Sequence, residues 1–300
     1  MTKVGQNEIG MVIMAGTMLV SPTLDILAKV LISDFHPVQI VFVRFFIHAI
    51  FFLSIIALRG RGFARPCLSH MLAGVLVATQ WLLLVASFSM MQVSTALTIF
   101  FVEPLLLVVL SFFLLREPLS ARNIGAVVVG LVGAAIVIRP NLASFGLIGL
   151  MPLGSAACFA LYLVLNKRTG AARGYLQMQL WVGTFAAVFF GIIIATMPLL
   201  GFSAYALKPI STLPHALLFL GIGVLGGAVH LCIAGALRLT PASVLAPFQY
   251  LELIGATLLG LWVFGTWPDY PTLCGAAVIV GAGIYSFNSG RQRTELAPVS

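Results

Sequence analysis

Long apolar runs, separated by short polar connections, cover almost all of this 300-residue sequence. A membrane-spanning helix needs about 20 consecutive, mostly apolar residues, and ten segments meet that requirement. The runs are too uniformly apolar for barrel strands of alternating polarity, and helices close their backbone hydrogen bonds within each segment. The sequence therefore predicts an all-α membrane protein with ten transmembrane helices. We expect them at residues 9–32, 37–58, 69–89, 93–115, 121–138, 146–166, 176–198, 215–237, 242–266 and 271–288.

Composition agrees with this pattern and leaves no room for a soluble domain. Hydrophobic residues make up 61% of the chain and charged residues only 8%, against roughly 25% charged in a soluble domain. The first ten residues, MTKVGQNEIG, lack the short apolar core and cleavage site of a removable signal peptide. The net charge of +8 is spread between the apolar runs, so it predicts no nucleic-acid surface.

The basic residues instead predict the orientation in the membrane. With a cytoplasmic N-terminus, the inside segments hold twelve Lys and Arg residues and the outside segments hold three, while Arg44 lies within a span. This positive-inside bias, with an even number of spans, places both termini in the cytoplasm. We predict a multi-pass protein of the cell membrane, the inner membrane of a bacterium.

The two halves of the sequence repeat one another. A shift of 149 residues aligns the spans that carry acids, and a shift of 138 aligns the earlier spans, because a longer connection around 201–213 absorbs the difference. Five spans is an odd number, so the repeats, residues 1–140 and 141–300, should be inverted in one membrane bundle. The aligned pairs are Trp81 with His230, Ser94 with Ser243, Glu103 with Glu252, Lys29 with Lys167 and Gln39 with Gln177.

The ends of both halves, Leu114 to Val137 and Ala246 to Tyr285, resemble the EamA family of the drug/metabolite transporter superfamily. The resemblance extends over nearly the whole chain and implies a two-times-five helix carrier. It also implies a small-metabolite substrate, since similar members take up S-adenosylmethionine-like or flavin-like compounds and others export amino acids or their derivatives. One departure is that Glu117 of the first half corresponds to Thr266 in the second.

Glu103 and Glu252 are the leading candidates for a functional site. At 1.5 Å per residue from their entry points, both acids should lie about 15–16 Å deep, near the centre of a core of about 30 Å. A charge there costs several kcal/mol unless it is paired, so an intramembrane acid is a functional candidate. The alternatives are binding a cationic substrate group, carrying a coupling proton, and a structural hydrogen-bonding role.

Other polar side chains within the spans extend this candidate site. Trp81 is too deep for the interfacial aromatic belt, and its ring is suited to stack on a planar or cationic substrate. Arg44 either snorkels outward, which we favour, or pairs with an acid or a substrate carboxylate. We assign Asp25 and Lys29 to an ion pair at the outer rim. The remaining candidates for substrate binding are His230, Gln80, Gln249, Tyr250 and Tyr162.

The sequence contains no motif for a metal ion or a cofactor. Cys67, Cys158, Cys232 and Cys274 lie far apart without metal-ligand spacing, so we expect small buried apolar side chains. The glycines form no phosphate-binding motif and suit close helix packing, so neither a cofactor nor ATP is expected.

These features predict a secondary transporter that carries a small amphiphilic or zwitterionic metabolite by alternating access. An exporter of amino acids or drug-like metabolites with the same fold is the main alternative, and a coupling proton and a homodimer are compatible with both. An integral-membrane lipid enzyme would gather His or acidic residues at one interface, whereas the five His residues are scattered. A purely structural subunit would gain nothing from midplane acids.

Overall fold

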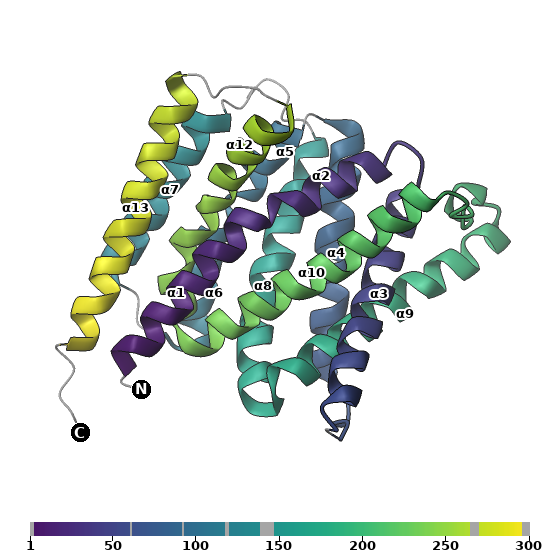
Figure 1. Ribbon diagram of the computed structural model, residues 1–300, viewed down its shortest axis with the longest axis horizontal. Helices are drawn as coiled ribbons and strands as arrows, with labels where there is room; N and C mark the ends of the chain where they lie inside the picture. The colour runs from purple at the N-terminus through teal and green to yellow at the C-terminus, as the bar shows by residue number, and fades with distance from the viewer. Residues whose placement is uncertain are drawn as a thin grey trace.

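The computed structural model describes residues 3–60, 62–91, 93–117, 120–138, 147–264 and 270–295, and this part of the chain is helical without strands (Figure 1). The first half contains α1 (Lys3–Val20), α2 (Pro22–Leu31), α3 (Pro37–Leu58), α4 (Leu68–Met90), α5 (Val93–Phe100), α6 (Glu103–Leu115) and α7 (Ala121–Ile138). The second half contains α8 (Leu150–Arg173), α9 (Tyr175–Thr196), α10 (Leu213–Leu239), α11 (Ala242–Leu245), the 3-10 helix η5 (Ala246–Tyr250), α12 (Leu251–Phe264) and α13 (Tyr270–Glu295). Single 3-10 turns are η2 (Leu147–Gly149), η3 (Pro198–Leu200) and η4 (Ser203–Tyr205).

Where the structure describes them, the predicted apolar runs fall on these helices, whereas residues 146, 265 and 266 of two runs lie outside the described residues. In the described residues, seven helical segments are long and apolar enough to cross a membrane, and α6, α7 and α13 contain shorter apolar stretches. The predicted span at 146–166 corresponds to α8, which continues to Arg173. The chain is thus a multi-pass membrane protein, and its large exposed apolar side chains, such as Trp262 at 84% exposure, suit contact with lipid.

Two predicted spans are broken near their middle. The run at 93–115 divides into α5 and α6, and the run at 242–266 divides into α11, η5 and α12. Pro104 lies in the first turn of α6 and Pro247 in the first turn of η5. Proline lacks a backbone donor and its ring disfavours a continuing helix, so it is found at such starts.

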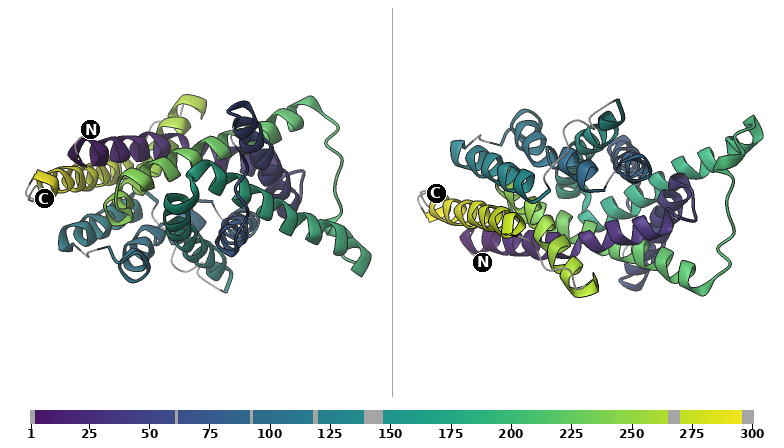
Figure 2. Two further views of the ribbon diagram at one scale, coloured as in Figure 1. Left: turned by 90° about the horizontal axis from the view of Figure 1, so that it is seen from below. Right: turned by 90° about the horizontal axis from the view of Figure 1, so that it is seen from above.

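The helices pack in a recurrent pairwise pattern. α7 lies along α13 at one side of the bundle, and α3 lies along α9 nearer the other side (Figures 1 and 2). Between them, α4 packs on α8 and α9, while α10 packs on α1 and α3. α6 contacts α8, and α12 contacts α1. The start of α1 and the end of α13 lie at one end of the bundle, which we call the termini end (Figure 1).

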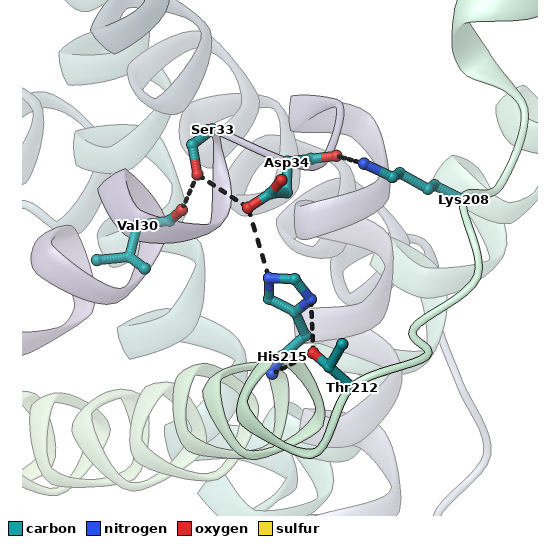
Figure 3. Close-up of polar contacts among 6 residues, drawn as sticks. All are labelled: Val30, Ser33, Asp34, Lys208, Thr212 and His215. Atoms are coloured by element: carbon teal, nitrogen blue, oxygen red, sulfur yellow. Dashed lines mark hydrogen bonds and ion pairs between the residues drawn. The ribbon is translucent and has the colours of Figure 1, made fainter.

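The connection between α9 and α10 projects from the bundle at the end opposite the termini (Figure 2) and is tied to the turn between α2 and α3. Lys208 Nζ donates to the Asp34 carbonyl at 2.9 Å, and His215 Nε2 lies 3.4 Å from the Asp34 carboxylate (Figure 3). Gln39 donates to the Lys208 carbonyl at 2.7 Å and accepts from its N–H at 2.9 Å. His36 Nδ1 accepts from Val38 N, and burial lowers the pKa of His36, which keeps this nitrogen an acceptor.

At the termini end, Gln177 makes the corresponding contact with the connection between α3 and α4. Its amide donates to the Gly62 carbonyl at 2.9 Å and accepts from Ala64 N at 3.3 Å. Trp181 adds a hydrogen bond to the Ala64 carbonyl at 2.9 Å. Each half of the chain therefore fastens a connection of the other half through one glutamine.

Candidate cavity between the two halves

A cavity lies between helices of both halves. It holds about 530 Å³ of space free of atoms, counted with its open mouth. Six of the nine predicted site residues line it, namely Arg44, Gln80, Trp81, His230, Gln249 and Glu252. The other lining residues are Met18, Ser21, Leu24, Asp25, Leu84, Leu97, Phe100, Phe159, Val229 and Ile233.

Arg44 is the most deeply enclosed charged group in this cavity. Its side chain has no exposed surface, so the favoured prediction that it snorkels outward is wrong. The guanidinium carbon lies 3.3 Å from the centre of the Trp81 ring, and Nη2 lies 3.3 Å from His230 Nε2. Nε and Nη1 are buried without a hydrogen-bond partner in the described residues. Two donors of a lining arginine are thus left for a ligand.

A hydrogen-bonded network fixes the imidazole that holds Arg44. Arginine has only donors, so His230 Nε2 must accept from it and Nδ1 must carry the proton. Nδ1 lies 2.9 Å from the Tyr162 hydroxyl, which also accepts from Asn166 at 3.0 Å. The same hydroxyl lies 3.4 Å from Gln179 Oε1, to which it can donate. Tyr162, a predicted site residue, therefore supports the cavity from outside its lining.

Two carboxylates share the cavity with Arg44. Glu252, at the start of α12, and Asp25, on α2, both line it and lie within electrostatic range of one another beside Ser21. The predicted ion pair of Asp25 with Lys29 at the outer rim is not among the ion pairs of the described residues: Asp25 lines the cavity, and Lys29 Nζ donates to the Phe88 carbonyl at 3.1 Å. Asp25 was missed as a site residue although it is also an acid within an apolar run.

Glu103 has a different position from Glu252, its predicted repeat equivalent. It is fully buried outside the cavity lining, near Gln249 and within electrostatic range of Glu252. Neither of its oxygens has a hydrogen-bond partner in the described residues, and Gln249 Nε2 is likewise unpaired. The Tyr250 hydroxyl donates to the Phe101 carbonyl at 3.2 Å, so this predicted residue also lies behind the cavity.

Gln80 presents a further unpaired group to the cavity. Its Nε2 lies 3.4 Å from Ser155 Oγ, while its Oε1 is buried without a partner in the described part of the chain. The lining thus combines guanidinium donors, an amide acceptor and two carboxylates over the apolar surface of Leu84, Phe100 and Phe159. Such a set can bind an anionic and a cationic group of one organic molecule at the same time.

No three His, Cys, Asp or Glu side chains of the described residues gather as ligands for a metal ion. The cysteines are free thiols there, and the prediction that they are buried is wrong: Cys232 is exposed, and Cys67, Cys158 and Cys274 are half-buried.

Several known proteins similar to this chain are named as transporters. An S-adenosylmethionine uptake transporter of Rickettsia bellii is 27% identical over 274 residues, which cover 89% of each protein. A riboflavin transporter of Vibrio cholerae is 28% identical over 182 residues, 59% of this chain and 57% of that protein. A solved crystal structure has the same fold, with a TM-score of 0.76 at 16% identity over 96% of this chain and 98% of that one. The sequence profile of the EamA-like transporter family matches residues 8–139 and 145–288, so this chain belongs to that family.

Proposed function

We propose that this protein is a secondary transporter that carries a zwitterionic metabolite, similar to S-adenosylmethionine, through the cavity by alternating access. The similarity to the Rickettsia uptake transporters over 89% of the chain supports this substrate class. The protein is a transporter of small metabolites by family and by relatives. No covalent chemistry is required of any residue.

The observation that carries the proposal is the position of Arg44 opposite two carboxylates. Arg44 Nε and Nη1, which have no hydrogen-bond partner in the described residues, offer donors to a substrate carboxylate, and Asp25 and Glu252 offer acceptors to cationic groups. With both carboxylates ionised, the three groups sum to one negative charge. S-adenosylmethionine, with its carboxylate, ammonium and sulfonium, carries one net positive charge and complements this set, whereas riboflavin has neither an ammonium nor a carboxylate group.

The packing supports two inverted repeats as the moving parts. The contacts correspond when each helix is replaced by its repeat equivalent in the other half. The contact of α4 with α8 then corresponds to that of α10 with α1, and the contact of α4 with α9 corresponds to that of α10 with α3. In the same way, the contact of α6 with α8 corresponds to that of α12 with α1. The contacts of α3 with α9 and of α7 with α13 each join a helix to its own repeat equivalent. Two halves of this kind can expose a site between them alternately to each side of the membrane.

The orientation that we propose has the termini end in the cytoplasm, because the basic connections gather there. If transport is coupled to a proton, the intramembrane acids Glu103 and Glu252 are the groups that would accept it. Exposed glycines such as Gly125 and Gly281 leave room for self-association, since a Cβ added at each of them would meet no atom within 4 Å.

Uptake into proteoliposomes tests the proposed function. We expect labelled S-adenosylmethionine to accumulate, to exchange with unlabelled compound inside, and to be displaced by it but not by riboflavin. Arg44→Gln and Glu252→Gln should each weaken substrate binding roughly 10- to 100-fold, since a hydrogen bond to a charged group contributes about 1.5–3 kcal/mol.

Arg173→Gln is the matched control, because Arg173 is an exposed arginine whose guanidinium contacts only a carbonyl, that of Arg65, among the described residues. It should bind and transport like the unaltered protein. Wild-type transport in both cavity variants would refute the proposed site, and binding of riboflavin but not S-adenosylmethionine would refute the substrate class.

A further inference from the structure

A second polar cluster lies away from the cavity, near the termini end. Lys167, on α8, forms an ion pair with Glu117, with Nζ 2.7 Å from Oε1. The same ammonium group donates to the Thr240 carbonyl at 2.9 Å, at the junction of α10 and α11. Glu117 accepts from Ala242 N at 3.2 Å and from Ser243 N at 3.1 Å. We call these contacts of Glu117 and Lys167 the latch.

The latch joins elements of both halves. Glu117 follows α6 in the first half, whereas Lys167, Thr240 and Ser243 belong to the second. Thr240 Oγ1 also donates to the Asn7 carbonyl of α1 at 3.1 Å. Opening a path from the cavity to the termini end requires these halves to separate there. Such a movement must break the ion pair and the hydrogen bonds of Glu117 together.

The backbone before Glu117 shows that its position is specified. Arg116 ends α6 in the left-handed region, with φ 56°, and is the non-glycine residue with positive φ in the described chain. This conformation is unfavourable for a residue with a Cβ and persists where the surroundings impose it. It turns the chain so that the next side chain, Glu117, reaches the start of α11.

At the opposite end, the described residues form no equivalent ion pair. Lys29 is the repeat equivalent of Lys167 and also donates to a carbonyl, that of Phe88 at 3.1 Å. The sequence equivalent of Glu117 is Thr266, which lies outside the described residues and has no carboxylate in any conformation. The contacts of Asp34 with His215 and Lys208 do not compensate, because they belong to the peripheral connection, whose counterpart at the termini end is the contact of Gln177.

We propose that the latch closes the cytoplasmic end of the carrier, and that its absence from the second repeat makes the outward-facing state the resting state. This inference rests on the proposed alternating access but not on the identity of the substrate. When the halves exchange conformations, Thr266, at the position equivalent to Glu117, provides no carboxylate for Lys29. In its resting state, the carrier without substrate therefore has its cytoplasmic end closed.

Side-specific labelling of the cavity tests this inference without any substrate. Ile233, which lines the cavity on α10, is replaced by cysteine in a background without the four native cysteines. A membrane-impermeant maleimide is then applied to right-side-out and inside-out vesicles. Glu117→Gln and Lys167→Met should each raise the labelling rate from the cytoplasmic face at least tenfold and lower the rate from the outer face.

Arg173→Met is the matched control for Lys167→Met, since both remove a basic side chain from the last turns of α8, and it should leave both rates unchanged. Glu117→Asp keeps the charge but shortens the reach to Ala242 and Ser243, so it should give the same shift if Glu117→Gln does not fold. Unchanged rates in folded variants overturn the proposal. Faster labelling from both faces also overturns it, because that result means general loosening rather than release of one end.

Discussion

The hydrogen bonds of His230 fix the orientation of the Arg44 guanidinium. The Tyr162 hydroxyl fixes the protonated nitrogen of His230, and the opposite nitrogen of that ring holds one arm of the guanidinium. Stacking on Trp81 holds its plane. The guanidinium is thereby held in one orientation before any substrate arrives, which lowers the cost of ordering on binding.

Tyr162→Phe should therefore lower both the affinity for substrate and the stability of the protein. It leaves His230 Nδ1 and Asn166 Nδ2 without their partner, at a cost of about 1–3 kcal/mol for each buried group. We expect a lower melting temperature in detergent and substrate binding weakened roughly tenfold, equivalent to about 1.4 kcal/mol. Tyr250→Phe removes a hydroxyl outside the lining and should not change affinity. Loss of stability with unchanged affinity would show that Tyr162 has no positioning role.

At this scale, residue type predicted much of the cavity but not the direction of side chains. A charged side chain within an apolar run costs free energy of desolvation wherever it lies. Glu252 and Arg44 could therefore be identified as candidate site residues from residue type alone. Asp25 was missed because spacing along one helix favoured Lys29 as its partner, whereas tertiary packing brings Glu252 and Arg44 to the same cavity. Glu103 follows the same cost rule and yet lies behind Gln249.

At the scale of helices, a close approach of α12 to the α1–α2 junction positions Glu252. A Cβ added at Gly255 would collide with the Leu19 carbonyl, a backbone group that cannot move aside easily. The apolar run predicted this helix, but its division into α11, η5 and α12 was not evident, because Pro247 fits both a gentle kink and a break. Packing against the α1–α2 junction is a property that one run cannot reveal by itself.

Gly255→Ala should consequently destabilise the protein. Overpacking against backbone costs about 1–3 kcal/mol, which corresponds to a melting temperature lower by roughly 2–10 °C. Gly281→Ala is the matched control, because a Cβ there meets no atom within 4 Å, and it should leave the melting temperature equal or higher. Equal thermal shifts for the two variants would contradict the close approach.

At the scale of the whole molecule, the proposed inverted repeat accounts for the similar contacts of distant residues. Gln39 holds the backbone of Lys208 with both amide groups, and Gln177 holds the connection at 62–64 in the same manner. The sequence predicted that these glutamines are equivalent, because a common shift aligns them. It could not predict that each binds the opposite half, since the partners are backbone groups of connections that have no distinctive sequence.

Hydrogen exchange measured by mass spectrometry tests this reciprocal fastening. Gln39→Ala should speed exchange of amides in the α9–α10 connection roughly 30-fold, because two hydrogen bonds of about 1 kcal/mol each to Lys208 are lost. Gln177→Ala should speed exchange around Ala64 and leave the α9–α10 connection unchanged. Each variant thus serves as the control for the other. Faster exchange in both connections from one substitution would mean that the two ends open together, which is incompatible with halves that close one end while opening the other.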